Sequence, residues 1–181
     1  GQFIWTGADY LGEAREWPSR GFYSGLLDLA NNIKPRGRFR QALWREDPVC
    51  WLGAYSKDNE EVEDSYDAWD CWDFEDGDVL RVVCYTNAAK VRLSLNGKPV
   101  GAMKDFDDET GIIGWDVPFE RGVLLAEAFD SDGNLVASHS LTSTSAPAAI
   151  KAELLDCGLR GEDGLACCKE SSATGLCGKD C

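Results

Sequence analysis

Apolar and polar positions alternate along much of the chain after residue 79, which is the pattern of short, half-buried strands. Between residues 91 and 95 every second residue is apolar and the residues between them are polar. This two-residue period predicts a strand with one face on a core. Asn96-Gly97 follows at once. This pair favours a tight hairpin turn, because both positions of such a turn need positive φ.

Similar β-rich runs recur through this part of the chain. They cover residues 50–55, 79–85, 112–117, 123–129 and 135–141. Turn residues separate the runs, and residues 103–111 are predicted to be a polar loop. About seven short strands within roughly 100 residues predict an antiparallel β-sandwich of the immunoglobulin type.

The first residues show a different pattern. Phe3, Ile4 and Trp5 form an apolar run that Thr6-Gly7 ends, and this predicts a strand buried on both faces, as in parallel sheets. The polar and aromatic residues 9–13 come directly after it. Such residues at the C-terminal end of a parallel strand are typical of the active-site rim of barrel enzymes.

A loop is predicted at residues 14–24, and a helix follows before residue 48. Pro35 suits the first turn of the helix, and Phe39, Leu43 and Trp44 recur at helical spacing. Pro48 ends the helix. Four arginines occupy its other faces, where they form either an anion-binding surface or a solvated one: Arg36, Arg38, Arg40 and Arg45.

Several segments together resemble glycoside hydrolase family 2, in its β-galactosidase branch. The resemblance begins with FIWTGADYLGE and SRGFYSGLLDLANNIKPRGRFRQALW, and it continues in WDFEDGDVLRVVCYTNAAKVRLSLNGKPVG and GWDVPFERGVLLAEAFDSDGNLVASHSLTSTSAPAAI. It covers about residues 1–150 and implies the last strand and helix of a (β/α)8 catalytic barrel, followed by an immunoglobulin-like domain.

The expected fold is therefore mainly β: an antiparallel sandwich preceded by a strand-loop-helix piece of a barrel. The expected boundaries place the barrel piece at residues 1–46 and the sandwich at residues 47–145. Residues 146–181 form a linker and a tail with five of the eight cysteines. Their spacing contains no C-x-x-C pair, which argues against zinc. The tail is then either a disordered terminus or a segment with oxidised cysteines. A truncated or altered reading frame would be a further explanation of these cysteines.

Residues 58–78 contain eleven Asp and Glu residues with Trp69 and Trp72 among them. Clustered carboxylates suit calcium, but the spaced D-x-D-x-D-G pattern of a calcium loop is missing. The segment is therefore predicted to be a solvated, partly disordered loop, and no metal or other cofactor is expected.

The resemblance implies a retaining glycosidase, in which two carboxylates about 5 Å apart carry the chemistry. In the family both glutamates lie on earlier barrel strands, so no catalytic residue is expected in this chain. Asp9 and Glu13 do not match the catalytic motifs. The resemblance makes Trp5 a wall of the sugar subsite, where an indole face suits a pyranose ring; an ordinary buried tryptophan is the alternative. Asp9 either binds sugar or holds the loop.

The net charge is −14, with an excess of about three positive charges in residues 1–45. An acidic chain is a poor partner for nucleic acid, and no run reaches the ~20 apolar residues of a membrane span. The compartment is open between a bacterial cytoplasm and secretion or the periplasm.

Two functions compete at this point. The first is a C-terminal fragment of a β-galactosidase-like enzyme, which cleaves terminal β-galactosides only together with the rest of the parent enzyme. The partners are then a galactoside-type saccharide and the remainder of that enzyme. The alternative is a non-catalytic carbohydrate-binding or adhesion module.

Overall fold

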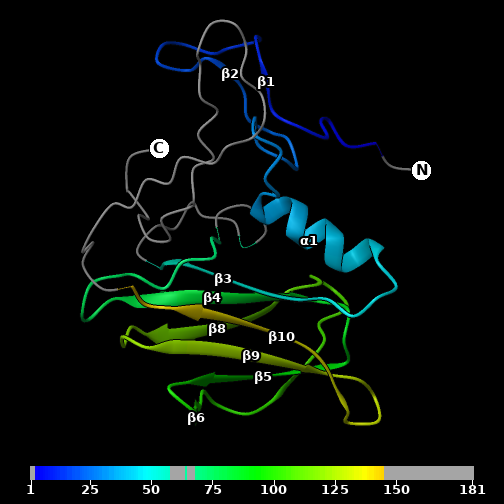
Figure 1. Cartoon of the computed structure of the whole chain (residues 1–181), viewed down its shortest axis with the longest axis vertical. Coiled ribbons are helices and arrows are strands. Elements are labelled where there is room, and N and C mark those ends of the chain that lie inside the picture. Colours follow the sequence, from blue (N-terminus) through cyan, green and yellow to red (C-terminus); the bar gives the residue numbers. More distant parts are fainter. Residues whose placement is uncertain (1–2, 58–63, 65–67, 145–181) are drawn as a thin grey trace, which may run out of the picture. The chain divides into compact units, whose positions relative to one another are not determined.

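The computed structural model describes residues 3–57, 64 and 68–144. Its helix is α1 (Pro35–Trp44). Its strands, all labelled in Figure 1 except the short β7, are β1 (Tyr10–Leu11), β2 (Gly21–Phe22), β3 (Cys50–Ser56), β4 (Val79–Thr86), β5 (Lys90–Leu95), β6 (Lys98–Pro99), β7 (Lys104–Asp105), β8 (Ile113–Pro118), β9 (Val123–Phe129) and β10 (Leu135–Thr142).

Eight of these strands form two antiparallel sheets, and this confirms the predicted sandwich. One sheet has the order β3-β4-β8, and the other has the order β10-β9-β5-β6 with β7 paired to β5. Figure 1 shows the strands of the two sheets stacked in layers. The strand β7 lies within residues 103–111, so the prediction of a loop there was wrong at Lys104 and Asp105, which pair with β5.

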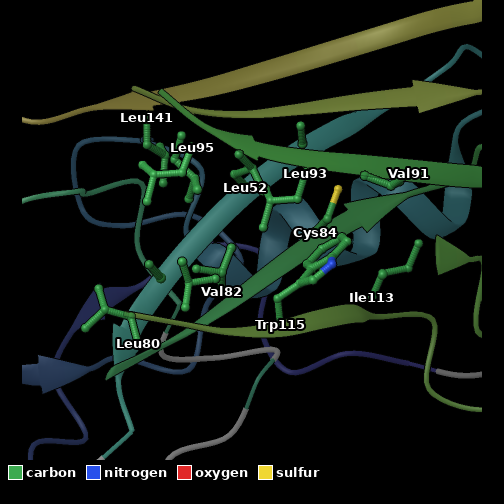
Figure 2. Close-up of a cluster of buried hydrophobic side chains, with 14 of the residues drawn as sticks. Leu52, Leu80, Val82, Cys84, Val91, Leu93, Leu95, Ile113, Trp115 and Leu141 are labelled. Atoms are coloured by element: carbon green, nitrogen blue, oxygen red, sulfur yellow. The ribbon is translucent and has the colours of Figure 1, made fainter. Parts of the chain in front are cut away.

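The core lies between the two sheets and is built by the alternating positions. Val91, Leu93 and Leu95 of β5 face inward and are at most 9% exposed, while Arg92 between them is exposed. Figure 2 shows these side chains gathered with residues of β4 and β8. Each buried Leu or Val side chain stabilises the fold by about 1.5–3 kcal/mol relative to an exposed one. The alternation in the sequence therefore accounts directly for this layer.

The hairpin predicted at Asn96-Gly97 is present between β5 and β6. Both residues have positive φ, 52° for Asn96 and 76° for Gly97. The Asn96 side chain also contacts the residues that lead into β9. Its amide nitrogen donates to the Arg121 carbonyl at 3.0 Å, and its oxygen accepts the Val123 N–H at 2.9 Å. The turn thus sets the register of β5 and also anchors the start of β9.

The prediction of a solvated loop was wrong for the part of the acidic segment that contains Trp72. This side chain is 1% exposed and belongs to the core between the sheets. It packs against Phe74 and Phe119, with ring centroids 6.2 and 5.5 Å away. Its indole N–H donates to the Glu120 carbonyl at 3.0 Å. The apolar area of the indole outweighs the local excess of acidic residues, of which Asp70 and Glu75 are exposed.

The predicted helix is confirmed, with Pro35 in its first turn, but its buried face differs from the predicted one. Leu43 and Trp44 are 42% and 62% exposed. Ala42 is buried instead, and half-buried Phe39 packs edge-on against Tyr85 of β4, 5.5 Å away. The small side chain of Ala42 allows the helix to approach the sheet closely, which the spacing of large apolar residues does not reveal.

Helix α1 covers the face of β3 and β4 that points away from the sandwich core. Ala42 shares an apolar cluster there with Trp51, Val83 and Tyr85, and the rings of Trp51 and Tyr85 stack at 4.9 Å. These strands are therefore buried on both faces, which explains why residues 82–85 are apolar without interruption.

The prediction of a buried strand at residues 3–5 was wrong for the chain as described. Phe3 is fully exposed and Trp5 is 72% exposed, and neither belongs to a strand. A strand exists only through pairing with neighbours. Residues 3–5 belong to none of the strands, and the nearest pairing after them is the parallel bridge of Ala8 to Leu27. The barrel piece of the predicted fold consequently stays a prediction.

Residues 14–24 were predicted to be a loop, but two of them form β2, which pairs with β1. The pairing places Tyr10 opposite Phe22, and their rings stack with centroids 5.6 Å apart. This cross-strand aromatic pair compensates for the shortness of the two strands. The predicted domain boundary at residue 46 and the tail from residue 146 onward remain predictions, and the tail and its cysteines lie outside the described residues.

His139 connects the two sheets at the edge where β10 meets β3, and this gives a pH-dependent stability. The Leu52 N–H donates to His139 Nδ1 at 3.2 Å. Burial lowers the pKa of His139, Asp70 opposes this shift, and Arg38 adds to it. The folded chain therefore binds a proton less readily than the unfolded chain, so stability is complete above about pH 6.5 and falls as the pH decreases below it.

We expect urea unfolding to show this loss of stability between pH 7 and pH 5. The variant His139→Gln keeps an acceptor but does not titrate, so its stability should change less over the same interval. Carboxylates titrate in both proteins, so their contribution cancels when the pH dependence of the unfolding free energy of one protein is subtracted from that of the other. Equal pH dependence of the two proteins would exclude His139 as the source.

Candidate functional site

The candidate site lies on the segment before the sandwich, where residues 4–40 form a shallow pocket. Trp5, Leu26, Arg36, Phe39 and Arg40 are among the side chains that line it, and its volume is about 110 Å³. Pockets that enclose small organic ligands usually measure about 300–1,000 Å³. The pocket is therefore too small to enclose a sugar by itself.

Trp5 is the aromatic wall of this pocket. Its side chain is 72% exposed, and the peptide bond that joins it to Thr6 is cis. Whether Trp5 is a wall of a sugar subsite or an ordinary buried tryptophan of the barrel stays a prediction. An exposed indole beside two guanidinium groups offers an apolar face and hydrogen-bond donors together, which is the combination that a sugar ring and its hydroxyls need.

Tyr10 and Glu13 lie next to Trp5 and form a polar network with it. The Tyr10 hydroxyl donates to the Glu13 carboxylate. This hydrogen bond raises the pKa of Tyr10, and a hydrogen bond with Trp5 has a smaller effect in the opposite direction. Glu13 thus orients Tyr10, and Tyr10 in turn contacts Trp5.

The two arginines of the pocket are both held by neighbouring groups. The Arg36 guanidinium donates to the Ser24 carbonyl at 2.8 Å. The guanidinium of Arg40 lies over the rings of Phe39 and Trp44, 5.6 and 5.9 Å from their centroids. The loop before helix α1 thus holds the guanidinium of Arg36, and side chains of the helix hold that of Arg40. Both cations give this pocket a positive character within an acidic chain.

Asp9, the second predicted site residue, is buried rather than open to the pocket. Its side chain is 5% exposed and pairs with Lys34, whose Nζ lies 2.9 Å from Oδ2. Oδ1 also accepts the Gly25 N–H at 2.8 Å. Lys34 in turn donates to the Tyr23 carbonyl at 2.6 Å. Of the two roles considered for Asp9, these contacts are those of a residue that holds the loop.

Gly25 shows how closely the loop and the Asp9 turn approach each other. A Cβ atom at Gly25 would lie 2.4 Å from the Asp9 backbone nitrogen, far inside van der Waals contact. The ion pair, the Gly25 hydrogen bond and this close approach together fix residues 23–25 against the turn that follows Trp5. Sequence reasoning singled out Asp9 but did not identify Lys34 or Gly25, because residues so far apart along the chain show no pattern that pairs them.

We expect Asp9→Asn to loosen this loop. Asparagine preserves the shape but leaves the half-buried Lys34 ammonium without its counter-charge, at a cost of about 2 kcal/mol. Hydrogen exchange of amides in residues 9–34 should then be roughly 30-fold faster, since 1.4 kcal/mol is a factor of ten.

Glu16→Gln is the matched control for this change, because Glu16 is an exposed carboxylate in the same segment. It should leave the exchange rates of residues 9–34 within a factor of two or three. Unchanged exchange in Asp9→Asn would show that the ion pair does not hold the loop.

The described residues contain no group of three or more His, Cys, Asp or Glu side chains arranged to bind a metal ion. The acidic residues that were considered for calcium lie partly outside the described ranges. Within those ranges, no helix has the length and the apolar character that crossing a bilayer requires.

Comparisons with known proteins show similarity to parts of longer proteins. A family described as "Domain of unknown function (DUF4982)" matches residues 77–137. The chain is 32% identical over 155 residues to "Beta-galactosidase BoGH2A" of Bacteroides ovatus, covering 83% of this chain and 16% of that protein. It is 30% identical over 165 residues to "Putative beta-glucuronidase" of Formosa agariphila, covering 86% of this chain and 14% of that protein.

Among solved structures, a glycosyl hydrolase family 2 member from Bacteroides cellulosilyticus is similar with a TM-score of 0.71 and 28% identity. The similarity covers 84% of this chain and 23% of that one. The chain thus spans about a sixth of the curated relatives that it matches. The family match at residues 77–137 lies within the sandwich. The chain is therefore related, over most of its own length, to glycoside hydrolase family 2.

Proposed function

We propose that this chain is the part of a family 2 glycoside hydrolase that supplies one wall of the sugar pocket and an accessory sandwich. The observation that carries the proposal is the exposed Trp5 indole over a pocket that Arg36 and Arg40 also line. The pocket is open and small, so the remaining walls and the catalytic carboxylates come from the rest of the parent enzyme.

The reaction is hydrolysis of a terminal β-galactoside by the retaining mechanism. One carboxylate attacks the anomeric carbon, and the other donates a proton to the leaving oxygen and then activates water. Trp5 contributes an apolar platform for one face of the ring. Its π-face also favours the positive charge of the oxocarbenium-like transition state over the neutral substrate, which raises kcat and not only affinity.

In this proposal Asp9 is a positioning residue and not a ligand of the sugar. Its carboxylate is engaged with Lys34 and the Gly25 N–H, so it fixes the turn that carries Trp5. The rigidity of that turn matters because a displacement of about 1 Å in a substrate-contacting group is enough to reduce the rate about 100-fold.

The identity of the sugar is the finer part of the proposal. One relative is named as a β-galactosidase and the other carries a β-glucuronidase name, so a galactoside and a glucuronide are the substrates to compare. They differ in the configuration at C4 and at C6, which is a hydroxymethyl group in the galactoside and a carboxylate in the glucuronide, so parallel assays of the longer enzyme with the two 4-nitrophenyl glycosides decide between them. We expect kcat/KM to be higher for the galactoside; a higher value for the glucuronide would replace that assignment.

The isolated chain is expected to show no turnover. Incubation with 4-nitrophenyl β-D-galactopyranoside should release nitrophenol at the rate of a buffer blank, because Asp9 is engaged and Glu13 has no partner carboxylate. Turnover above that of a matched Glu13→Gln and Asp9→Asn double variant would contradict the proposal, because it would place a working carboxylate pair in this chain.

The alternative function is a non-catalytic carbohydrate-binding module. Calorimetric titration of the isolated chain with galactosides and polysaccharides separates it from the first proposal. If the chain supplies only one side of the sugar pocket, its Kd for a monosaccharide should be millimolar or weaker. A micromolar Kd without turnover would favour the binding module. The sequence upstream of Gly1 adds a further test, since the first proposal requires two barrel glutamates there.

A further inference from the structure

Cys50 and Cys84 form a pair of neighbouring thiols inside the sandwich that the proposed function does not use. Cys50 is opposite Thr86 in the β3–β4 ladder, and Cys84 is opposite Leu52. The two cysteines are thus diagonal neighbours on the same face of the sheet. Their sulfur atoms are 3.7 Å apart, which is close to van der Waals contact.

We propose that Cys50 and Cys84 are a disulfide-forming pair, which a small-molecule disulfide such as oxidised glutathione converts into a covalent link between β3 and β4. A disulfide has an S–S length of about 2.05 Å, so the sulfur atoms must approach by roughly 1.6 Å. Cys50 is the first residue of β3, and β3 is an edge strand of its sheet. Small adjustments are easiest at the end of an edge strand.

The two thiols differ in access, and this sets the order of the steps. Cys84 is fully buried, and Figure 2 shows its sulfur among the core side chains. Cys50 is only partly buried. The Cys50 thiolate therefore attacks the disulfide reagent first, forms a mixed disulfide and releases one glutathione thiolate. Cys84 then loses its proton to solvent and attacks the Cys50 sulfur, which releases the second glutathione. Two protein thiols are oxidised and one reagent disulfide is reduced to two thiols.

The second step is expected to be the slow one. In the reduced pair, the hydrogen bond with Cys50 and burial raise the pKa of the Cys84 thiol. Burial still disfavours the thiolate once Cys50 is in the mixed disulfide, so little of Cys84 is thiolate at neutral pH. Ring closure should accelerate roughly ten-fold per pH unit below that pKa, because the thiolate is the attacking species.

The link would close the chain around the acidic segment. The disulfide would join residues 34 positions apart in the sequence. The closed loop would contain residues 51–83, which include the acidic stretch and Trp72. Restricting the unfolded chain in this way should raise the melting temperature of the oxidised protein by about 5–10 °C. The pair would therefore make the stability of the sandwich depend on the redox state around it.

The test is a linkage map of the full chain. Protein reduced with dithiothreitol is incubated with oxidised glutathione, quenched with N-ethylmaleimide and digested with trypsin. The sequence places Cys50, Cys71 and Cys84 in separate peptides, residues 46–57, 58–81 and 82–90. We expect the 46–57 and 82–90 peptides to be linked in more than half of the molecules, and the linked fraction to fall at least five-fold when oxidation is done in 6 M guanidinium.

Recovery of both peptides carrying N-ethylmaleimide after prolonged oxidation would overturn the proposal. A predominant link from Cys50 to Cys71 or to a tail cysteine would overturn it too. Melting curves add a second measurement: the difference between oxidised and reduced protein should shrink in Cys50→Ala relative to the natural chain. The map uses the natural chain, so it remains decisive even if that variant does not fold.

Discussion

Replacing Trp72 with alanine is expected to lower the free energy of unfolding of the sandwich by about 3–5 kcal/mol. The indole is 1% exposed and packs against Phe74 and Phe119, so alanine leaves a large cavity between three aromatic positions. The Glu120 carbonyl would also lose its indole donor. Because domains are stable by only about 5–15 kcal/mol, a single substitution of this size should bring the sandwich close to unfolding.

Trp69→Ala is a matched control for this substitution. Trp69 is the same residue type three positions earlier, but its side chain is 50% exposed. Its link to Ala54 consists of two backbone hydrogen bonds, 2.8 and 3.2 Å long, which alanine preserves. Trp69→Ala should therefore lower the free energy of unfolding by less than about 1 kcal/mol. Urea unfolding followed by circular dichroism measures both variants, and similar midpoints for the two would contradict the placement of Trp72 in the core.

The strands of the sandwich could be predicted from the sequence because each has its own local signal. Alternation within residues 91–95 marks the inward face, and Asn96-Gly97 marks the turn. The apolar stretch at residues 82–85 was also recognised as a strand. What the alternation could not show is that helix α1 covers the outer face of β4, because that depends on Ala42 meeting Tyr85 and Val83, which are distant in the chain.

Trp72 was missed for a related reason. In the sequence it lies among acidic residues, and local composition predicts a solvated loop. Its burial is decided by Phe119 and Glu120, nearly fifty residues later. An apolar residue inside a charged stretch is a weak signal until a partner is known, although the three aromatic residues at positions 69, 72 and 74 could have drawn attention to the segment.

The first residues show the opposite error, since the apolar run at Phe3–Trp5 predicted a buried strand. An apolar run indicates that a segment is suited to burial, but it does not show whether the chain contains a surface that buries it. Trp5 and Asp9 were singled out through a family resemblance, and the structure separates them. Trp5 lines a pocket, whereas Asp9 is buried with Lys34. That distinction required side-chain positions, which no spacing rule supplies.

In the longer enzyme to which we assign this chain, Trp5→Ala is expected to reduce kcat/KM for a β-galactoside about 100-fold. Loss of the indole removes an apolar platform and a π-face that stabilises developing positive charge, together worth roughly 2–3 kcal/mol in a desolvated site. Most of the loss should appear in kcat, because the charge develops only in the transition state. Trp5→Phe should recover part of the activity, because phenylalanine keeps a smaller aromatic face.

Trp17→Ala provides a closely matched control. Trp17 is 78% exposed, much like Trp5, and it belongs to the same segment, where Arg20 lies over its ring 5.5 Å from the centroid. It is not among the side chains that line the Trp5 pocket. Its removal should change kcat/KM less than about three-fold, so the comparison separates loss of a sugar contact from loss of an exposed tryptophan.

The ratio of kcat/KM between Trp5→Ala and Trp17→Ala tests the central claim of a sugar-facing wall most directly. The account predicts a ratio near 1:30 or lower, with the difference carried mainly by kcat. Equal activities of the two variants, each close to that of the unaltered enzyme, would contradict it.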